Sequence, residues 1–186
     1  GEAFFKKAGE AGLLGLTFAE EYGGSGLSCE TQILAHEELS KVCPGATIAL
    51  ATSLAGMEII LKHGTEEQKQ KYLSKLCSGE WRGAFGLTEP GAGTDAAMQK
   101  TVAEDKGDHW VLNGSKIFIT NAGYANVFII IAITGVKLDK RGRKSKEISA
   151  FIVERTDKGF SVGKHEKKMG IKGSSTCELV MEDCVI

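Results

Sequence analysis

The segment Ala84–Asp95 (AFGLTEPGAGTD) combines the residue types of a ligand-binding loop. It leaves an expected strand over Arg82–Leu87, turns at Pro90, and then offers small residues over 91–94. Small residues let backbone N–H groups approach a ligand closely, as phosphate and heteroaromatic groups require. An ordinary surface loop built on Pro-Gly-x-Gly remains the alternative interpretation of this segment taken alone.

Residues 91–96 (GAGTDA) also fit the relaxed dinucleotide fingerprint G-x-G-x-x-A. That fingerprint works where its glycines open a helix inside a βαβ unit. Here a β-hairpin pattern follows, and Pro90 precedes the first glycine. No G-K-[ST] follows the loop, which excludes a Walker-type phosphate loop as well. We therefore expect neither of these two nucleotide-binding motifs.

A second segment, Asn113–Asn121 (NGSKIFITN), places an aromatic ring beside a hydroxyl. In a regular strand, alternation puts Ile117 and Ile119 on one face and Phe118 and Thr120 on the other. Such a face can form a flat, hydrogen-bonding wall for a ring system. A strand whose outer face merely carries Phe and Thr is the alternative.

Cysteines and histidines form no pattern typical of a metal site or a disulfide framework. The cysteines are odd in number and include no C-x-x-C pair, so we expect free thiols in a reducing compartment. The histidines lack ligand spacing, so we expect no metal. These residues are Cys29, Cys43, Cys77, Cys177 and Cys184, and His36, His63, His109 and His165.

Composition excludes several classes of protein. The chain has 186 residues, of which 42% are hydrophobic and 25% charged, unlike disordered or collagen-like chains. The net charge of −1 gives no cationic field, so we expect no nucleic-acid partner. The longest apolar run, Val127–Ile133, is far shorter than the ~20 residues that span a bilayer. We expect no membrane partner and a cytoplasmic location, or the mitochondrial matrix in a eukaryote.

The periodicity of apolar residues changes near residue 80. Before it, three- and four-residue spacing predicts helices around 4–14, after Ser28, around 51–63, and from a T-x-x-Q capping box at Thr65. After it, a period of two predicts short strands at 82–87, 101–104, 109–113, 116–120, 127–134, 148–154 and 177–181. The fold class is therefore α+β: a partial helical domain over 1–80 and a mainly antiparallel, sandwich- or barrel-like β-domain over 81–186. The basic insertion 137–146 (KLDKRGRKSK) is expected at a solvated hairpin tip, although a partner site is the alternative.

Taken together, the two segments resemble the acyl-CoA dehydrogenase family. Residues 85–95 (FGLTEPGAGTD) resemble the first signature of that family, and 113–121 resemble its strand carrying W-I-T or F-I-T. Shorter matches in the same order extend the resemblance over essentially the whole chain: 18–26, 37–40, 64–71 and 169–179. Within the family, the residues of these segments are most similar to those of short-chain, butyryl-CoA-dehydrogenase-like bacterial members.

The resemblance implies an FAD-dependent enzyme of fatty acid metabolism. Such enzymes hold FAD between a β-domain and a following helical domain, and oxidise a fatty acyl-CoA thioester to trans-2-enoyl-CoA. A glutamate removes the α-proton while a hydride passes from the β-carbon to flavin N5. The electrons then pass to an electron-transferring flavoprotein.

The resemblance also assigns residues to the cofactor. Thr88 would bond the pyrimidine side of the flavin, Thr120 would lie near N5, and Thr94 stands where relatives use Ser to contact substrate or cofactor. The full set implied for cofactor binding is Phe85, Gly86, Leu87, Thr88, Gly93, Thr94, Phe118, Ile119 and Thr120. Donors at N5 and at the pyrimidine edge stabilise the reduced ring, because it gains electron density there.

Departures from the family pattern limit what the resemblance assigns. The sequence starts inside the family's N-terminal helical domain and stops where the link to the C-terminal helical domain begins, so we expect a fragment. That later domain normally supplies the catalytic glutamate, much of the adenosine contact and the main oligomer surface. We therefore assign no catalytic residue, and expect a homo-oligomer at full length. Phe118 replaces the commoner Trp, which keeps an aromatic wall but loses an N–H donor.

Two other functions share these features. An acyl-CoA oxidase carries both signatures but reoxidises its flavin with oxygen. A non-catalytic module would hold flavin or acyl-CoA without any base.

Overall fold

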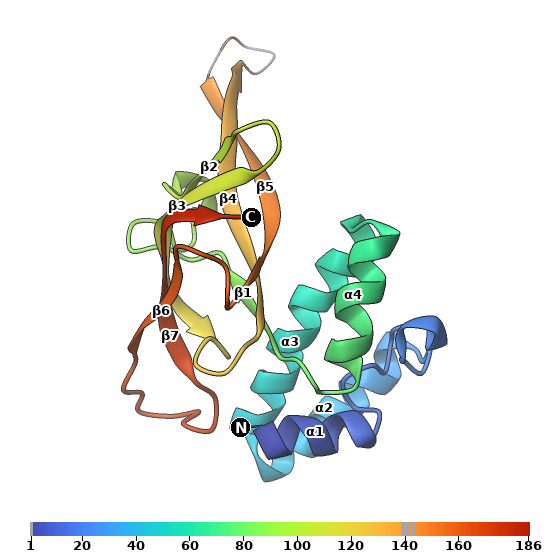
Figure 1. Ribbon diagram of the computed structural model, residues 1–186. Coiled ribbons are helices and arrows are strands. Elements are labelled where there is room, and N and C mark those ends of the chain that lie inside the picture. The colour runs from blue at the N-terminus through green and yellow to red at the C-terminus, as the bar shows by residue number, and fades with distance from the viewer. Residues whose placement is uncertain (1, 139–141, 143) are drawn as a thin grey trace.

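A computed structural model describes residues 2–138, 142 and 144–186, and shows a helical half followed by a sheet half (Figure 1). Within these residues the helical half comprises α1 (Glu2–Glu10), η1 (Glu20–Tyr22), α2 (Cys29–Val42), α3 (Pro44–His63) and α4 (Glu66–Cys77). The sheet half comprises β1 (Gly83–Gly86), η2 (Ala96–Met98), β2 (Val102–Asp105), β3 (Trp110–Thr120), β4 (Val127–Leu138), β5 (Lys144–Glu154), β6 (Phe160–His165) and β7 (Thr176–Val185). The predicted α+β class is confirmed.

Local capping explains where the helices begin. Ser28 caps α2 by accepting a hydrogen bond from the backbone N–H of Thr31, and Pro44 opens α3 at a position where a missing N–H is harmless. At α4 the predicted capping box is present: the Thr65 hydroxyl accepts from the Gln68 N–H at 3.2 Å, and the Gln68 side chain accepts from the Thr65 N–H at 3.0 Å.

Helix α3 is the central helix of the fold. The helix predicted around 51–63 is present, and it begins earlier, at Pro44. Its fully buried residues include Leu50 and Met57, whereas Ala55 is exposed. The helix is apolar almost all round, so periodicity selects no face. By length and composition it could cross a membrane, but half of its apolar window is buried inside the protein, where it packs against α4 and β1.

The strands form one curled sheet in the order β1-β4-β2-β3-β7-β6, with β5 paired along the whole length of β4. Most pairings are antiparallel, as expected, but β1 pairs with β4 in parallel, and β2 meets β4 in parallel at one residue pair. A parallel neighbour requires a crossover, which here is the chain between β1 and β4, residues 87–126, and includes η2, β2 and β3. The sheet is neither two packed sheets nor a closed barrel within the described residues.

Strand β3 is longer than predicted. The break expected between the strands 109–113 and 116–120 was wrong, because Asn113 and Gly114 lie inside one strand, at an irregularity in its pairing with β7. Gly114 has a φ of 148°, and a Cβ there would lie 2.5 Å from the Thr101 hydroxyl. Strand β6 was missed because its exposed, mixed sequence (FSVGKH) has no clear alternation.

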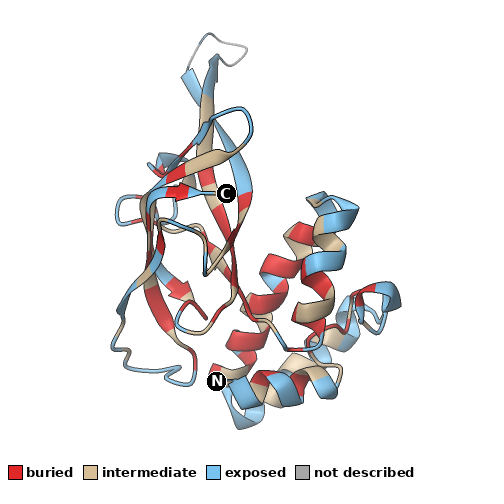
Figure 2. Cartoon of the chain, viewed as in Figure 1, coloured by how far each residue is buried: buried red, intermediate tan, exposed pale blue. Residues whose placement is uncertain are grey.

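The two halves share a core, as the continuous buried band in Figure 2 shows. Leu54 and Met57 of α3 cluster with Val127 and Ile129 of β4. A separate cluster fills the hollow of the sheet, where Phe128 stacks against Phe160 with ring centroids 4.6 Å apart. Helix α3 is therefore held against the sheet by apolar packing.

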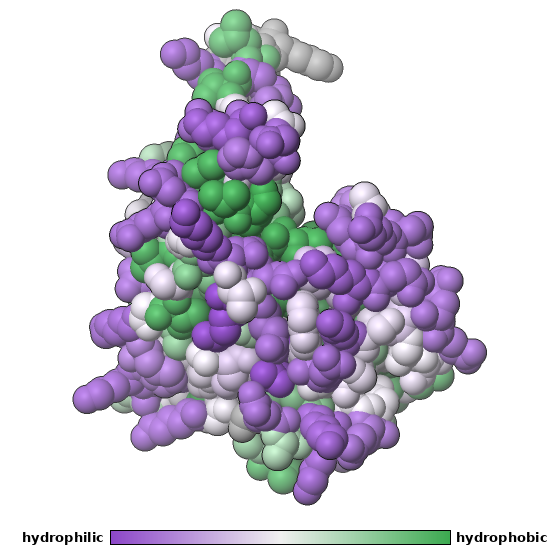
Figure 3. Space-filling view, in the orientation of Figure 1, coloured by the Kyte–Doolittle hydropathy of each residue, from purple (hydrophilic) through white to green (hydrophobic). Residues whose placement is uncertain are grey.

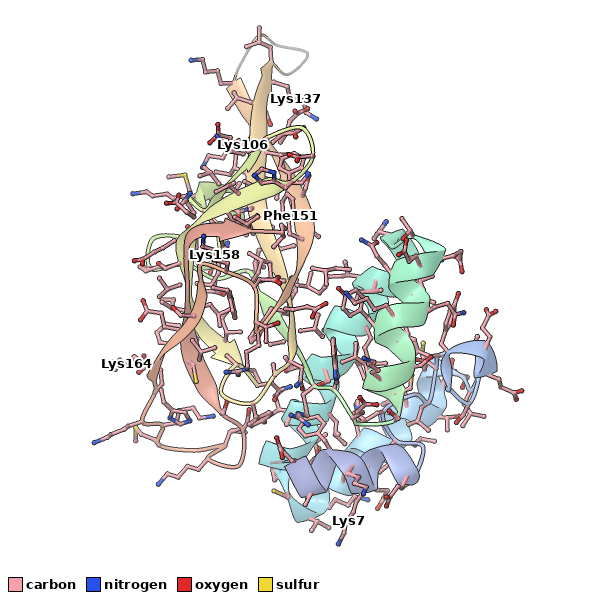
Figure 4. All side chains as sticks on the ribbon, viewed as in Figure 1. Lys7, Lys106, Lys137, Phe151, Lys158 and Lys164 are labelled. Atoms are coloured by element: carbon pink, nitrogen blue, oxygen red, sulfur yellow. The ribbon has the colours of Figure 1, made fainter. Side chains whose placement is uncertain are left out.

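The basic insertion extends the β4–β5 hairpin away from the body of the molecule, and Lys137 lies on this arm (Figure 4). Residues 139–141 and 143, which include the predicted tip, lie outside the described residues. Lys146 turns back, and its ammonium donates to the carbonyls of Ala97 and Gln99 at 2.9 and 2.8 Å. One lysine of the insertion therefore anchors the loop that contains η2.

The capping box at α4 gives the first prediction. Thr65→Ala should lower the free energy of unfolding by about 1 kcal/mol, because the N–H of Gln68 loses its acceptor. Urea denaturation measures this, with Ser161→Ala at an exposed position of β6 as the control, expected within ~0.5 kcal/mol of the parent. Equal losses in both variants would contradict a capping role.

Candidate functional site

A cavity of about 400 Å³ lies between helix α3 and the strands β1 and β3. Its walls combine side chains from both predicted segments with side chains of the helix. The lining residues are Ile48, Ala51, Thr52, Ala55, Phe85, Leu87, Thr88, Phe118, Ile119 and Thr120. Six of the nine residues predicted to bind a cofactor are therefore brought together around one cavity.

The other three predicted residues lie elsewhere. Gly86 is buried, and a Cβ there would come within 2.7 Å of the Ile130 Cδ1, so this glycine serves packing between β1 and β4. Gly93 and Thr94 are exposed on the loop after the Glu89–Ala92 turn and do not line the cavity.

Sequence reasoning missed the helix wall of this cavity. Ile48, Ala51, Thr52 and Ala55 recur at three- and four-residue spacing, so they lie on one face of α3. Ile48 is 42% exposed and Ala55 is exposed, whereas the opposite face of the helix is buried. Because α3 is apolar almost all round, its sequence carries no signal that separates this face from the buried one.

A β-bulge sets the orientation of Phe118. The register between β3 and β7 shifts between Lys116 and Ile119, and Phe118 has a φ of 59°. The bulge interrupts the predicted alternation through 117–120: Phe118 is 60% exposed and Ile119 is buried, as alternation requires, but Phe118, Ile119 and Thr120 all line the same cavity. A left-handed conformation at a bulky aromatic residue costs about 1–3 kcal/mol, so the surrounding structure must hold it there.

The segment from Leu87 to Ala92 is held in place by backbone bonds. The N–H of Ile117 donates to the Thr88 carbonyl at 2.9 Å. Glu89 and Ala92 exchange two N–H to carbonyl bonds, each 3.1 Å, and so close a tight turn over Pro90-Gly91. Thr88 is thereby fixed beside β3, with its half-buried side chain at the cavity.

A buried ion pair lies directly behind this wall. The ammonium of Lys116, fully buried, donates to Glu89 at 2.7 Å, to the Gln99 side-chain carbonyl at 3.0 Å and to the Leu87 carbonyl at 3.1 Å. The Glu89 carboxylate also accepts from the backbone N–H groups of Lys100 at 2.6 Å and Thr101 at 3.0 Å. All three ammonium protons have acceptors.

This network controls the protonation of Glu89. Burial by itself would raise the pKa of the carboxyl, but the hydrogen bonds from Lys116 and from the backbone at 100 and 101 outweigh it and lower the pKa from 4.5 to about 2. Glu89 is therefore a carboxylate at every physiological pH, and the Lys116 charge stays compensated.

The cavity itself offers hydroxyls and apolar surface. Among its lining residues in the described part of the chain there is no carboxylate, imidazole, thiol or amine. Thr88 and Thr120 can donate hydrogen bonds, and Phe85 and Phe118 provide flat aromatic surface. This arrangement suits an uncharged planar heterocycle with hydrogen-bonding edges. It supplies no acid or base of its own.

A second hollow is not associated with the predicted residues. It is an apolar groove of about 360 Å³ between α3, α4 and the β4–β5 pair, where green side chains gather between sheet and helices in Figure 3. Ile59, Tyr72 and Phe151 contribute to its walls. Within the described ranges no group of three or more His, Cys, Asp or Glu residues could hold a metal ion.

Two domain profiles of one protein family match this chain. The N-terminal domain profile of acyl-CoA dehydrogenases matches residues 1–80, and the middle domain profile of the same family matches residues 84–184. The chain belongs to the acyl-CoA dehydrogenase family. The resemblance inferred from the two sequence segments is thereby confirmed.

Individual acyl-CoA dehydrogenase relatives match nearly the whole chain. A short-chain specific acyl-CoA dehydrogenase of Clostridium acetobutylicum is 54% identical, over 97% of this chain and 47% of its own length. A chain in a structure of the electron transferring flavoprotein of Acidaminococcus fermentans is 50% identical with a TM-score of 0.89, over 98% of this chain and 47% of its own. An acyl-CoA dehydrogenase from Bacillus anthracis, solved in complex with FAD, is 44% identical with a TM-score of 0.87, over 98% and 31%. The chain spans about half or less of the length of these relatives.

The ion pair behind the wall gives the second prediction. Glu89→Gln should lower the free energy of unfolding at pH 7 by about 3 kcal/mol, because the buried Lys116 loses its anionic partner. The folded-state pKa of Glu89 lies below its usual value. Its contribution is therefore complete above pH 4.5 and is lost as pH falls from 4.5 towards 2. Between pH 5 and 3 the variant should consequently lose about 2 kcal/mol less stability than the parent.

Urea denaturation at pH 7, 5 and 3 measures both effects. Glu104→Gln, which changes an exposed carboxylate on β2, is the control and should keep the pH dependence of the parent. A parent-like loss of stability between pH 5 and 3 in Glu89→Gln would show that another group titrates there.

Proposed function

We propose that this chain forms the flavin-facing part of an FAD-dependent short-chain acyl-CoA dehydrogenase. The observation that carries the proposal is the convergence of Phe85, Leu87, Thr88, Phe118, Ile119 and Thr120 on one cavity. The family pattern assigns these residues to the flavin. The 54% identity to a short-chain specific relative supports the short acyl chain.

The cavity fits a flavin ring on its own features. It has three threonine hydroxyls, those of Thr52, Thr88 and Thr120, two aromatic rings and no charged lining side chain. The strained backbone at Phe118 turns one of these rings to the edge of the cavity. Bulges and strained residues concentrate at functional sites because they re-aim side chains. FAD, when bound, would accept a hydride from the β-carbon of the acyl thioester.

The residues of the chain then have distinct tasks in this proposal. Thr120 would donate to the flavin at the edge where electron density rises, and Thr88 would donate at the pyrimidine edge. Phe118 and the apolar residues of α3 would exclude water from the reacting bond. The described cavity wall holds no base, so the proton of the α-carbon must leave to a residue from another part of the protein.

Electrons leave the proposed enzyme to an electron-transferring flavoprotein. Family membership supports this acceptor, as does the 50% identity to a chain in the structure of the electron transferring flavoprotein of Acidaminococcus fermentans. Transfer to oxygen, as in an acyl-CoA oxidase, is the competing outcome.

The third prediction concerns the reaction. Anaerobic addition of butyryl-CoA to the full-length holoenzyme should bleach the oxidised flavin absorption, because hydride transfer reduces the ring. Palmitoyl-CoA should do so much more slowly. Absence of bleaching with any acyl-CoA would remove the proposed activity, and rapid oxygen consumption during turnover would favour the oxidase.

The fourth prediction concerns Thr120. Replacing its hydroxyl in Thr120→Val removes one hydrogen bond to the reduced ring, so the flavin midpoint potential should fall by about 30 mV, or about 1.4 kcal/mol for two electrons. Val keeps the β-branched shape, so the thermal midpoint of the protein without flavin should change little. Redox titration measures the shift.

Thr134→Val on β4 is the matched control, since Thr134 bonds only Ser149 among the described side chains and lies outside the cavity. Its potential should equal that of the parent. Equal shifts in the two variants would exclude a direct contact between Thr120 and the flavin.

A further inference from the structure

Asn121 follows the last residue of β3, and its side chain joins three elements that line the cavity. It is fully buried. Its amide nitrogen lies 2.7 Å from the carbonyl of Ala49, 3.1 Å from the carbonyl of Gly83 and 3.3 Å from the hydroxyl of Ser53. Ala49 and Ser53 belong to α3 and Gly83 to β1, so one NH₂ group bonds helix and strand at once.

The opposite end of the same amide fixes its orientation. Its Oδ1 accepts from the Tyr124 hydroxyl at 2.8 Å, while the backbone N–H of Asn121 donates to the Ser175 carbonyl at 2.9 Å. A flipped amide would place its oxygen against the carbonyls of Ala49 and Gly83, which can only accept hydrogen bonds. The NH₂ group therefore faces the cavity walls.

The bonded groups are close in sequence to the cavity residues. Ile48, Ala51 and Thr52 of α3 line the cavity, and we call them the helix wall. Ala49 and Ser53 are sequence neighbours of these residues on the same helix. On the other side, Thr120 precedes Asn121 directly, and together with Phe118 it forms what we call the strand wall.

The backbone at Asn121 restricts which residue can occupy this position. Its φ of 68° lies in the left-handed region, which Asn, Asp and Gly adopt most readily. Gly would keep the backbone without strain but would leave the acceptors of Ala49 and Gly83 without this donor. Asp would present oxygens to acceptors. Of these three residues, Asn alone satisfies both the backbone and the acceptors.

We propose that Asn121 is a positioning residue that sets the separation of the helix wall from the strand wall. The inference rests on the proposed function for its catalytic consequence. Its side-chain amide forms hydrogen bonds to α3 and to β1. Thr120 directly precedes it in the chain, so the position of Thr120 relative to α3 depends on these bonds. Losing the amide would let α3 shift relative to Thr120, and displacements near 1 Å can cost about 100-fold in rate.

The test compares Asn121→Gly with Tyr124→Phe in the full-length holoenzyme. Asn121→Gly should slow flavin reduction by saturating butyryl-CoA about tenfold or more, and should change the flavin absorption spectrum. Tyr124→Phe removes the bond to Oδ1 but keeps the NH₂ donors, so its rate should stay within about twofold of the parent even if its thermal midpoint falls.

Amide hydrogen exchange of the flavin-free protein gives a readout that does not depend on the proposed function. The backbone amides of residues 48–55 should exchange faster than in the parent in Asn121→Gly, and at the parent rate in Tyr124→Phe. If the parent holoenzyme is not reduced by any acyl-CoA, the proposed function fails, while faster exchange confined to α3 still supports Asn121 as the tie between the walls.

Two outcomes would overturn the inference. One is a folded Asn121→Gly protein with the exchange and reduction rate of the parent. The other is a Tyr124→Phe protein in which the exchange and the reduction rate change as much as they do in Asn121→Gly. If Asn121→Gly is recovered only unfolded, Ser53→Ala takes its place. This variant removes one acceptor of the amide and also the 3.3 Å bonds of the Ser53 hydroxyl with the N–H and carbonyl of Gly83. A two- to fivefold slower reduction with faster exchange of residues 48–55 supports the tie between α3, β1 and Asn121, and parent-like exchange and rate overturn it.

Discussion

The burial of one ammonium group, that of Lys116, constrains the architecture around the cavity. A lysine without solvent exposure needs a compensating charge and an acceptor for each proton, because an unpaired buried ion costs several kcal/mol. Glu89, Gln99 and the Leu87 carbonyl meet that need. These groups come from loops that no regular strand pairing would place beside β3. Since Thr88 lies between Leu87 and Glu89, its position at the cavity depends on the same ion pair.

The ionised side chains and the side chains that line the cavity thus lie in separate layers. The ionised groups are buried behind the wall and neutralise one another, while the wall itself offers hydroxyls and rings. In the proposed function, such a neutral wall would avoid a fixed charge beside a flavin whose own charge changes on reduction. On the opposite side, the helix wall is tied to the sheet by neutral hydrogen bonds of Asn121 and by the apolar cluster of Leu54 and Met57 with Ile129.

The sequence predicted local features well and long-range ones poorly. The capping box at Thr65 and the cap at Ser28 are complete within a few residues, so their residue types suffice to identify them. The two signature segments likewise identify most of the cavity. The parallel pairing of β1 with β4, the bulge at Phe118 and the buried face of α3 depend instead on which distant segments meet. No pattern within β1 or α3 alone carries that information.

The parallel β1–β4 pairing has a consequence for biosynthesis. Arg82 and Asn126, bonded at 3.1 Å beside the start of that pairing, lie 44 residues apart in the chain. A ribosome that adds about 5–20 residues per second leaves β1 without its partner for several seconds. During that interval the apolar residues of α3 and β1 have no sheet to cover them, whereas the β4–β5 hairpin can close locally as it emerges. The apolar face of α3 that packs on Val127 and Ile129 therefore stays uncovered until β4 has been synthesised.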